Sequence, residues 1–507
     1  MTERLTPDVC IVGGGSAGLV VAAGAAQLGL EVVLVERAMM GGDCLNFGCV
    51  PSKALIAAAK AAQAQRSGGA FGIAPVEPRI DFPRVMDHVA ETIAAIAPND
   101  SVERFEKLGV RVLKEEARFV GRTEIQAGPH RIASKRVVLA TGSRAALPPI
   151  PGLADTPHFT NETIFANRTL PAHLLIIGGG PIGIEMAQAF RRLGSRVTVL
   201  EAATFLPKDD PEAADIVVAQ LRKEGVDLRS GIKVDCVERS SDGVVAVLGD
   251  GTRLAGSHLL VAAGRTAVTE GLDLDKAGIA HTKHGIAVDS SLRTSNRNVW
   301  AIGDCNGLYA FTHMAGYEAS LFIRGALFRM PAKLDAAIVP WATYCDPELA
   351  QVGLGERAAR EKHGDRIRVM RWQFAENDRA QAERATCGLV KVVTDRRGRI
   401  LGATIAGPQA GELIQPWCLA ISKRLRISAL AGFVPPYPTL GEAGKRAAGS
   451  YFTETLFGPR MRGLVRFLAE TGLGERVVRR FQLYLADWQR VIMMLRANYE
   501  PAVPTAS

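Results

Sequence analysis

Two stretches of sequence decide the fold of this chain: CIVGGGSAGLVVAAGAAQLGLEVVLVE at residues 10–36 and LIIGGGPIGIEMAQAFRRLGSRVTVLE at residues 175–201. A shift of 165 residues superposes them. In both, a strand-length apolar run leads into a glycine turn, a helix-length stretch and a second β-branched run that ends on an acid. The repeat predicts an α/β protein with two Rossmann-like dinucleotide-binding domains.

The glycines of each copy are spaced to hold a pyrophosphate. The first allows a tight turn, the second lets the backbone approach the phosphates at a helix N-terminus, and the third lets helix and strand pack closely. These residues are Gly13, Gly15 and Gly18 in the first copy and Gly178, Gly180 and Gly183 in the second. The same two sites include the helix-opening residues Ser16, Ala17, Pro181 and Ile182. A glycine-rich turn without a nucleotide is the alternative for one copy, but two copies in register favour two bound dinucleotides.

Each copy ends on an acid, Glu36 or Glu201, 18 residues beyond its third glycine. This is close to the spacing at which a carboxylate bonds the ribose hydroxyls of a nucleotide. A carboxylate at Glu201 also repels a 2′-phosphate, and residues 202–207 contain no arginine that would bind one. The sequence therefore favours NADH over NADPH at the second site.

A cysteine pair follows the first copy in the stretch GGDCLNFGCVPSKAL, where Cys44 and Cys49 have a C-x4-C spacing. No metal site is expected, because zinc needs about four ligands and the nearest histidine is His88. Residues five apart on an ideal helix have Cα atoms about 8.6 Å apart, whereas a disulfide spans about 4.4–6.8 Å. A bonded pair therefore needs an irregular turn, which Gly48 permits. Two inert buried thiols are the alternative to a redox pair.

Composition is typical of a globular cytoplasmic protein. The 507 residues suit about three domains, and the balance of 22% charged and 47% hydrophobic residues excludes a disordered chain. The other six of the eight cysteines are scattered, unlike those of a secreted disulfide scaffold, and we expect no signal peptide. Residues 9–30 are uncharged, but three glycines interrupt them, which predicts a strand, a turn and a buried helix rather than a membrane span.

Together these motifs resemble the class I pyridine nucleotide-disulfide oxidoreductases, the flavoproteins that include dihydrolipoamide dehydrogenase, glutathione reductase and mercuric reductase. The likeness begins with GGGSAG, Glu36 and GGDCLNFGCVPSK. It continues through ATGSR at 140–144, GGGPIGIE at 178–185, AAGR at 262–265, AIGDC at 301–305 and CDPELAQVGLGE at 345–356, and it spans about residues 5–455. The resemblance implies an FAD-binding domain at 1–150 and 273–335, interrupted by an NAD(P)-binding domain at 151–272, and a C-terminal α+β dimerisation domain at 336–455.

In enzymes of this kind, electrons pass from NAD(P)H through FAD to a redox disulfide. By resemblance, Cys49 is the thiol beside the flavin and Cys44 is the thiol that meets the substrate. Lys53 and Glu185 would form an ion pair beside the flavin ring; a surface lysine and a surface glutamate are the alternative. The resemblance also implies FAD contacts at Lys53, Gly42, Asp43, Ala117, Thr141, Gly142, Ser143, Asp304, Ala310, Thr312 and His313, and NAD(P) contacts at Glu185 and Gly264.

The sequence departs from this family near its C-terminus. Members with disulfide substrates carry a His-Pro-Thr-x-x-Glu motif, whose histidine exchanges protons with the substrate. Here residues 435–442 read PPYPTLGE, so Tyr437 replaces the histidine while Glu442 remains, and His363 is the last histidine of the chain. A phenol with a pKa of about 10 is a poor base at pH 7. A dihydrolipoamide-type reaction should therefore be severely impaired.

Mercuric reductases place a tyrosine at this position, and GPQAGELIQ at residues 407–415 also resembles them. Those enzymes need a C-terminal cysteine pair, whereas this chain has no cysteine after Cys418. We therefore expect a mercuric reductase-like, NAD(P)H-dependent oxidoreductase with a small-molecule acceptor. The alternatives are a dihydrolipoyl dehydrogenase with a substitute base, a membrane-surface flavin carrier of electrons to quinone, and a flavin-binding protein without turnover.

The final segment, residues 456–507, is rich in arginine. It holds eight arginines, no lysine and four acids, in a chain whose net charge is +9. An apolar stripe opposite arginines predicts a basic amphipathic helix at 475–496, which packs on the protein's own dimer or, alternatively, makes a peripheral contact with an anionic membrane. No motif indicates nucleic acid. The resemblance further implies a homodimer in which Tyr437 and Glu442 reach the active site of the partner subunit.

Overall fold

The computed structural model describes residues 3–471 and residue 482, and its first domain is built on a five-stranded parallel sheet. The strand order is β20-β8-β2-β3-β4, with bounds Val299–Ala301, Arg136–Leu139, Val9–Val12, Val32–Val35 and Val110–Leu113. Helices α1 (Ser16–Gln27) and α9 (Thr312–Phe322) pack on one face, where Val9 and Ile11 lie. Cys10 and Val12 face the opposite way, so β2 is buried on both sides. The uncharged run is thus a strand, a turn and a helix, as predicted.

A second, smaller sheet covers the other face of the first domain. Its order is β1-β7-β6-β5, with bounds Glu3–Leu5, His130–Ala133, Glu124–Ala127 and Ala117–Phe119. Ala117, Phe119, Ile125 and Ile132 belong to the cluster that contains Cys10 and Val12. Because β20 joins the large sheet beside β8, this domain is assembled from segments on either side of the second domain. The exact residue limits of the domains stay a prediction.

The second domain repeats the same arrangement. Its parallel sheet has the order β12-β11-β10-β16, with bounds Asp227–Ser230, Arg196–Glu201, His173–Ile177 and His258–Val261. Helices α7 (Pro181–Arg192) and α8 (Pro211–Lys223) pack on one face. The antiparallel strands β13 (Val234–Ser240), β14 (Gly243–Leu248) and β15 (Arg253–Gly256) cover the other. The predicted pair of Rossmann-like domains is confirmed.

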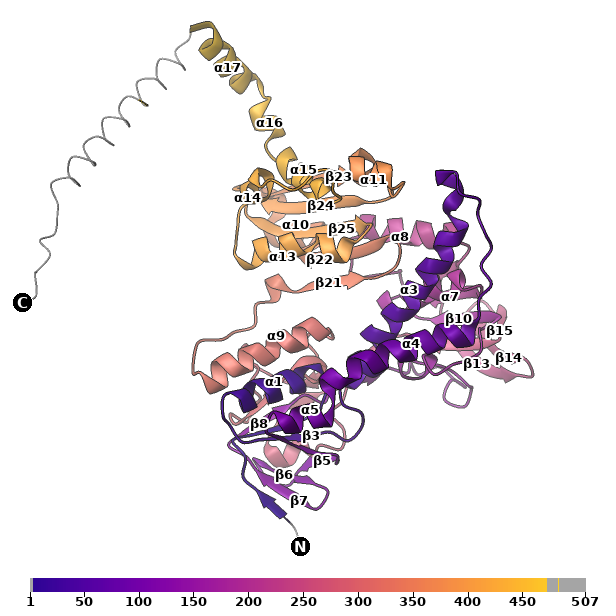
Figure 1. Ribbon diagram of the computed structural model, residues 1–507, viewed down its shortest axis with the longest axis vertical. Helices are drawn as coiled ribbons and strands as arrows, with labels where there is room; N and C mark the ends of the chain where they lie inside the picture. Colours follow the sequence, from indigo (N-terminus) through magenta and orange to yellow (C-terminus); the bar gives the residue numbers. More distant parts are fainter. Residues whose placement is uncertain (1–2, 472–481, 483–507) are drawn as a thin grey trace, which may run out of the picture.

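The C-terminal domain is α+β, as expected. Its antiparallel sheet has the order β21-β22-β25-β24-β23, with bounds Pro340–Thr343, Glu348–Gly353, Ile400–Gly407, Leu389–Asp395 and Ile367–Gln373. Helices α13 (Gln415–Ser422), α14 (Ile427–Gly432) and α15 (Glu442–Ser450) share its core. The domain lies at the opposite end of the molecule from the N-terminus, with the second domain at the side (Figure 1).

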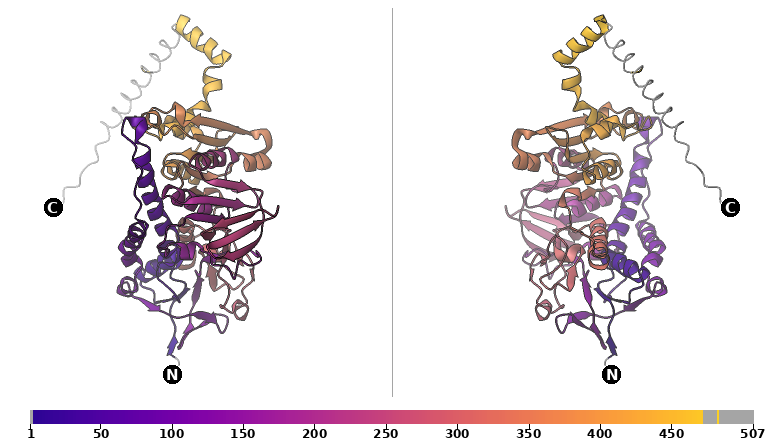
Figure 2. Two further views of the ribbon diagram at one scale, coloured as in Figure 1. Left: turned by 90° about the vertical axis from the view of Figure 1, so that its right-hand side faces the viewer. Right: turned by 90° about the vertical axis from the view of Figure 1, so that its left-hand side faces the viewer.

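Two long helices connect these parts. Helix α3 (Cys49–Arg66) begins in the first domain and packs against α7 of the second and against α4 (Phe82–Ile96). Figure 2 shows α3 running along one edge of the molecule. The shorter elements used below are α2 (Gly42–Asn46), α6 (Asn161–Ile164), α10 (Glu356–His363), β9 (Ser143–Ala145) and its antiparallel partner β17 (Arg265–Ala267).

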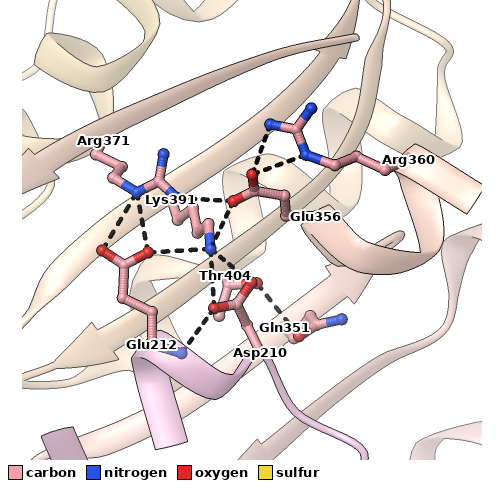
Figure 3. A network of polar contacts seen from close by, with 8 residues as sticks. All are labelled: Asp210, Glu212, Gln351, Glu356, Arg360, Arg371, Lys391 and Thr404. Atoms are coloured by element: carbon pink, nitrogen blue, oxygen red, sulfur yellow. Dashed lines mark hydrogen bonds and ion pairs between the residues drawn. The ribbon is translucent and has the colours of Figure 1, made fainter. Parts of the chain in front are cut away.

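A buried ion cluster joins the second domain to the C-terminal domain (Figure 3). Lys391 of β24, whose side chain is only 5% exposed, lies 2.9 Å from Asp210, 3.0 Å from Glu212 and 2.9 Å from Glu356. Arg371 of β23 adds bonds to Glu212 and Glu356. Three carboxylates therefore neutralise the buried ammonium, which makes its burial tolerable and holds α8 against the C-terminal sheet.

Beyond the C-terminal domain, the described chain ends in two short helices, α16 (Thr453–Leu456) and α17 (Pro459–Thr471). Helix α17 projects away from the body (Figures 1 and 2). The helix predicted at 475–496 lies outside the described residues. Among the described residues, no helix combines the length and the apolar character that a membrane span requires.

Candidate active site

The cysteine pair lies where two helices meet at an irregular turn. Cys44 belongs to α2, and Cys49 is the first residue of α3. Between them, Gly48 has φ −123° and ψ −110°, outside the helical region. A Cβ at Gly48 would come within 2.8 Å of the Asp43 carboxylate, so only glycine fits comfortably. The chain therefore has the irregular turn at Gly48 that a bonded pair would need, and both cysteines are free thiols in this structure.

The environment of the pair separates the acidities of the two thiols. The hydrogen bond from Cys44, the hydroxyl of Thr312 at 3.4 Å and the charge of Lys53 lower the pKa of Cys49 to about 6. That same hydrogen bond, together with burial, raises the pKa of Cys44. Thr312 is also the first residue of α9, and a helix N-terminus favours negative charge. At neutral pH, Cys49 is therefore a thiolate and Cys44 a thiol.

Lys53 and Glu185 form an ion pair of 2.8 Å one helical turn beyond Cys49. Lys53 comes from α3, whereas Glu185 comes from the first turns of α7, and its side chain is 6% exposed. Burial alone would lower the pKa of Lys53, but the Glu185 carboxylate outweighs it and the pKa is raised. The pair is thus charged, and it links the helix of the thiols to the helix of the second dinucleotide motif.

Tyr344 contacts both members of this ion pair, and it was not identified from the sequence. Its backbone N–H donates to Glu185 at 2.8 Å, and Lys53 Nζ lies 4.5 Å from the centre of its ring. Tyr344 follows β21 and precedes the CDPE stretch, in a loop of the C-terminal domain. The only sequence signal was its position beside that stretch; the contact itself depends on how the domains pack.

Helix α7 holds this loop with one face. Gln188 donates to the carbonyl of Asp346 and accepts from its N–H, both at 2.7 Å. Arg192 lies 3.0 Å from the Asp346 carboxylate and 2.7 Å from Glu224. Because Gln188 and Arg192 lie about one and two turns beyond Glu185, the three side chains share a face of the helix. Through Asp346, Gln188 and Arg192 hold the loop that carries Tyr344.

Both glycine turns fit a dinucleotide. A Cβ at Gly13 or Gly18 would collide with backbone atoms, and the same holds for Gly178 and Gly183. At Gly180 the space is open, and Gly15 meets nothing closer than 3.7 Å. Each turn therefore leaves a surface of bare backbone at a helix N-terminus, which suits a pyrophosphate. Ser16, Ala17, Pro181 and Ile182 form the first turns of α1 and α7.

The two terminal acids occupy equivalent places. Glu36 accepts from the N–H groups of Gly14 and Ala38, both at 2.6 Å. Glu201 accepts from Gly179 at 2.7 Å and Ala203 at 2.8 Å. These bonds hold each carboxylate beside its glycine turn, at the carboxyl end of a parallel strand. Ribose hydroxyls are recognised at this place in a Rossmann fold.

Several predicted FAD residues converge on Arg265, which the sequence did not single out. Arg265 Nε bonds the Ser143 hydroxyl at 2.7 Å and lies 3.7 Å from Asp304, while Nη2 is 3.1 Å from Asp43. Ser143 in turn donates to Asp304 at 2.5 Å. Asn161 of α6 bonds Asp43 at 3.0 Å. Five segments that are far apart in sequence therefore meet at one polar cluster between the first and second domains.

The remaining predicted cofactor residues lie around this region. A pocket of about 60 Å³ is lined by Gly13, Glu36, Ala117 and Thr141. Gly142 and Gly264 have positive φ and open space where a Cβ would lie, and Gly42 packs on Gly15. Ala310 directly precedes the Phe311 N-cap of α9, and His313 Nε2 lies 2.8 Å from the Pro340 carbonyl.

The structure does not bring every predicted residue to the thiols. Tyr437 is 68% exposed and donates to Asp378 at 2.8 Å, while Glu442 pairs with Arg446 at 2.9 Å. Within residues 3–471, neither side chain bonds to Cys44 or Cys49. Their predicted contribution to a partner's site remains a prediction.

Within residues 3–471, no group of three or more histidine, cysteine and acidic side chains is arranged to hold a metal.

Comparison with known families covers most of the chain. Residues 7–319 match the family model described as pyridine nucleotide-disulphide oxidoreductase, and residues 339–448 match its dimerisation domain. Mercuric reductase of Streptomyces lividans is 33% identical over 459 residues, which is 88% of this chain and 96% of that protein. Dihydrolipoyl dehydrogenase 3 of Pseudomonas aeruginosa is 34% identical over 462 residues, 87% and 97% of the two chains.

Two solved structures share the fold. The Cu(II) complex of the HOCl-induced flavoprotein disulfide reductase RclA from Escherichia coli has a TM-score of 0.80 at 28% identity, covering 89% of this chain and all of that one. LpdA from Mycobacterium tuberculosis also has a TM-score of 0.80, at 26% identity, covering 88% and 99%.

Proposed function

The chain belongs to the pyridine nucleotide-disulphide oxidoreductase family, and we propose that it uses NADH to reduce a thiophilic metal ion, the acceptor class of a mercuric reductase, at Cys44 and Cys49. The family match makes it a flavoprotein oxidoreductase that depends on FAD and NAD(P)H, with a dimerisation domain. FAD supplies a two-electron relay between the nicotinamide and the thiols. The finer assignments rest on residues of this chain.

The thiol pair is the observation that carries this proposal. Cys49 is a thiolate near neutral pH, because its pKa is lowered to about 6 by the Cys44 hydrogen bond, Thr312 and Lys53. Cys44 is half-buried and can meet an acceptor. Oxidation of the Cys49 thiolate and the Cys44 thiol to one disulfide releases two electrons and one proton, and two electrons match reduction of a divalent ion to the metal or of two Cu(II) ions to Cu(I). Thiolates are ligands that soft metal ions prefer.

Glu201 supports NADH as the donor. Its carboxylate is held beside the glycine turn by the N–H groups of Gly179 and Ala203. The negative charge of Glu201 would repel the 2′-phosphate of NADPH, and residues 202–207 contain no arginine that would bind this phosphate. The charge at this one position therefore favours NADH.

Tyr437 supports a metal ion over a dithiol substrate. The hydrogen bond to Asp378 raises the pKa of its phenol further above the ordinary value, so it is a weak proton acceptor at pH 7. The resemblance to mercuric reductases also implies a tyrosine at this position, and the chain is 33% identical to one of them. The E. coli structure is a Cu(II) complex of a related reductase. Dihydrolipoyl dehydrogenase is the second candidate, favoured by the relative from P. aeruginosa.

An anaerobic titration with NADH tests the thiol relay. In the wild type, we expect a long-wavelength absorbance from the Cys49 thiolate to appear on reduction. In Cys49→Ser this band should be absent, while the flavin still bleaches. If the reduced Cys49→Ser variant shows the same long-wavelength band as the wild type, the thiol relay is wrong.

An acceptor screen then tests the metal assignment. NADH oxidation is measured with Hg(II), Cu(II) and lipoamide, for wild type and Tyr437→His. We expect metal-dependent turnover in the wild type, and lipoamide turnover only after the histidine is introduced. Efficient lipoamide turnover by the wild type would instead establish a dihydrolipoyl dehydrogenase.

A further inference from the structure

The helices α16 and α17 lie beyond the part of the chain that the family models match, which ends at residue 448. Helix α15 is the last element in the C-terminal core. From there α17 projects outward and rests on no other domain (Figures 1 and 2). Helix α17 is therefore an addition to the part of the fold that the family models match, and its surface is not accounted for by that fold.

This extension exposes large apolar side chains. The exposed fractions are 52% for Leu456, 62% for Phe457, 48% for Leu464, 59% for Val465, 52% for Phe467 and 37% for Leu468. On α17, Leu464, Val465 and Leu468 recur at helical spacing and share one side with Met461. Neighbouring exposed apolar residues in such a row indicate a surface that contacts something else.

By helical spacing, Arg460 and Arg462 flank this apolar side, whereas Arg466 lies nearer the opposite side. Arg460, Arg462 and Arg466 lie on α17, against a single acid, Glu470. Across the described residues, none of these three guanidinium groups forms an ion pair. The surrounding segment 456–507 has eight arginines, no lysine and four acids. Unpaired arginines beside an exposed apolar face suit an anionic layer with an apolar interior.

We propose that α17 docks on an anionic phospholipid surface, with Leu464, Val465 and Leu468 inserted and the arginines at the headgroups. A second copy of the helix fits less well, because packing two such faces together would place like-charged arginines side by side. The reductase body would then stand off the membrane on the α16–α17 stalk. This inference concerns where the enzyme binds, and it stands independently of the proposed electron acceptor.

Co-sedimentation of the full-length holoenzyme with vesicles tests the proposal. The vesicles are phosphatidylcholine alone and phosphatidylcholine mixed with phosphatidylglycerol. We expect about tenfold more bound enzyme on the anionic vesicles, and a loss of that excess when salt screens the charges. Equal binding to both vesicles, or to neither, overturns the proposal.

Two variants and two controls assign the binding to α17. Leu464→Ser with Leu468→Ser removes apolar contact, and Arg460→Gln, Arg462→Gln and Arg466→Gln together remove charge. The controls are Ile73→Ser with Val76→Ser, which are exposed apolar residues elsewhere, and Arg357→Gln on the surface of α10. Both α17 variants should lose at least about half of the anionic excess, and the controls none. Equal effects in variants and controls contradict the assignment.

Two further measurements on the same proteins separate the other outcomes. Flavin absorbance and NADH oxidation should be unchanged in every variant, which shows that the enzyme is folded and that loss of vesicle binding is not loss of chemistry. Sedimentation velocity gives the oligomeric state. If the Leu464→Ser, Leu468→Ser variant dissociates the dimer, a second copy covers α17, and the membrane proposal is wrong.

Discussion

The low pKa of Cys49 depends on three neighbours, Cys44, Thr312 and Lys53, and each of them can be replaced separately. Because the Cys44 hydrogen bond is the largest influence that lowers its pKa, Cys44→Ala should move the pKa from about 6 toward the ordinary thiol value of about 8.5. Cys44→Ser keeps a hydrogen-bond donor, so the pKa of Cys49 in this variant should lie between its values in the wild type and in Cys44→Ala. The measurement is the rate of alkylation of the reduced enzyme against pH, which rises as the thiolate forms. Coincident pH profiles for wild type and Cys44→Ala would refute this account.

Lys53 acts on the same thiolate through its charge. Lys53→Met should therefore raise the pKa of Cys49 as well, since a nearby cation favours the ionised form. It also leaves the buried Glu185 carboxylate without its partner. Lys60→Met is the matched control, because Lys60 lies two turns further along α3 and pairs with Glu348 instead. The alkylation profile of the control should match the wild type.

Tyr344 should matter through its ring and not through its hydroxyl. The ring lies over Lys53, whereas the backbone N–H holds Glu185, so Tyr344→Phe keeps both contacts and Tyr344→Ala keeps only the second. A cation–π contact of this kind contributes about 0.5–1 kcal/mol, which corresponds to a change of about two- to fivefold. We expect stopped-flow flavin reduction by NADH to slow by that factor in Tyr344→Ala alone. Equal rates in all three proteins would count against a role for the ring.

At the residue scale, sequence reasoning reached the groups that carry a local signature. Cys44 and Cys49 have their spacing, and Glu36 and Glu201 follow their glycine turns at a fixed distance. Tyr344 has no such signature, and Arg265 ends the AAGR motif without any local pattern that identifies its partners. Their contacts join segments of different domains, with Arg265 linking residues 43, 143 and 304. Such contacts depend on domain packing, which no local pattern encodes.

At the scale of elements, one face of α7 positions the loop that carries Tyr344. Gln188 is 3% exposed, and its amide makes both hydrogen bonds to the Asp346 backbone. Gln188→Ala leaves a partly buried N–H and a partly buried carbonyl of Asp346 without their partner, at a cost of about 1–3 kcal/mol in the free energy of unfolding. Gln65→Ala, at an exposed position of α3, should cost less than about 0.5 kcal/mol. Urea denaturation of the two holoenzyme variants measures the difference.

The element pattern itself was largely predictable. Each Rossmann repeat predicted a strand, a turn and a helix, and the structure has β2 and α1 in the first repeat and β10 and α7 in the second. This prediction was possible because the spacing of apolar residues and of glycines is a local property of the sequence. The break between α2 and α3 followed from the geometry of the cysteine pair and Gly48. The joining of β20 to β8 was implied only by family resemblance, since strand partners that are distant in sequence leave no periodic trace.

At the scale of the whole molecule, Lys391 holds two domains together. Its ammonium lies among Asp210, Glu212 and Glu356, and Lys391→Met leaves these carboxylates close together with less positive charge (Figure 3). Breaking a buried pair on one side costs about 3–5 kcal/mol. Lys276→Met breaks a surface pair with Asp273 and should cost less than about 1 kcal/mol. Denaturant midpoints of the holoenzymes measure both, and equal losses would show that the cluster is dispensable.

The same cluster predicts an acid limit to stability. Burial alone would raise the pKa of Glu356, but hydrogen bonds from Lys391 and Arg360 outweigh it and lower the pKa to about 2. A lowered pKa means that the folded state holds the ionised form, so this contribution is present above about pH 4.3 and is lost as the pH falls toward 2. Lys391→Met should flatten the pH dependence of the denaturant midpoint in that window. A profile parallel to the wild type would contradict this origin.

The dimer decides whether Tyr437 takes part in catalysis. In one subunit it is exposed and bonded to Asp378, without contact to the thiols, so a catalytic role requires the partner. If each site pairs the cysteines of one subunit with Tyr437 of the other, a mixed dimer of Cys49→Ser and Tyr437→Ala subunits has one site with both groups intact. Each homodimer has none. Co-expressed and separately tagged mixed dimers should therefore recover close to half of the wild-type turnover with the preferred acceptor, whereas sites built within single subunits predict no more than the mean of the two parent homodimers.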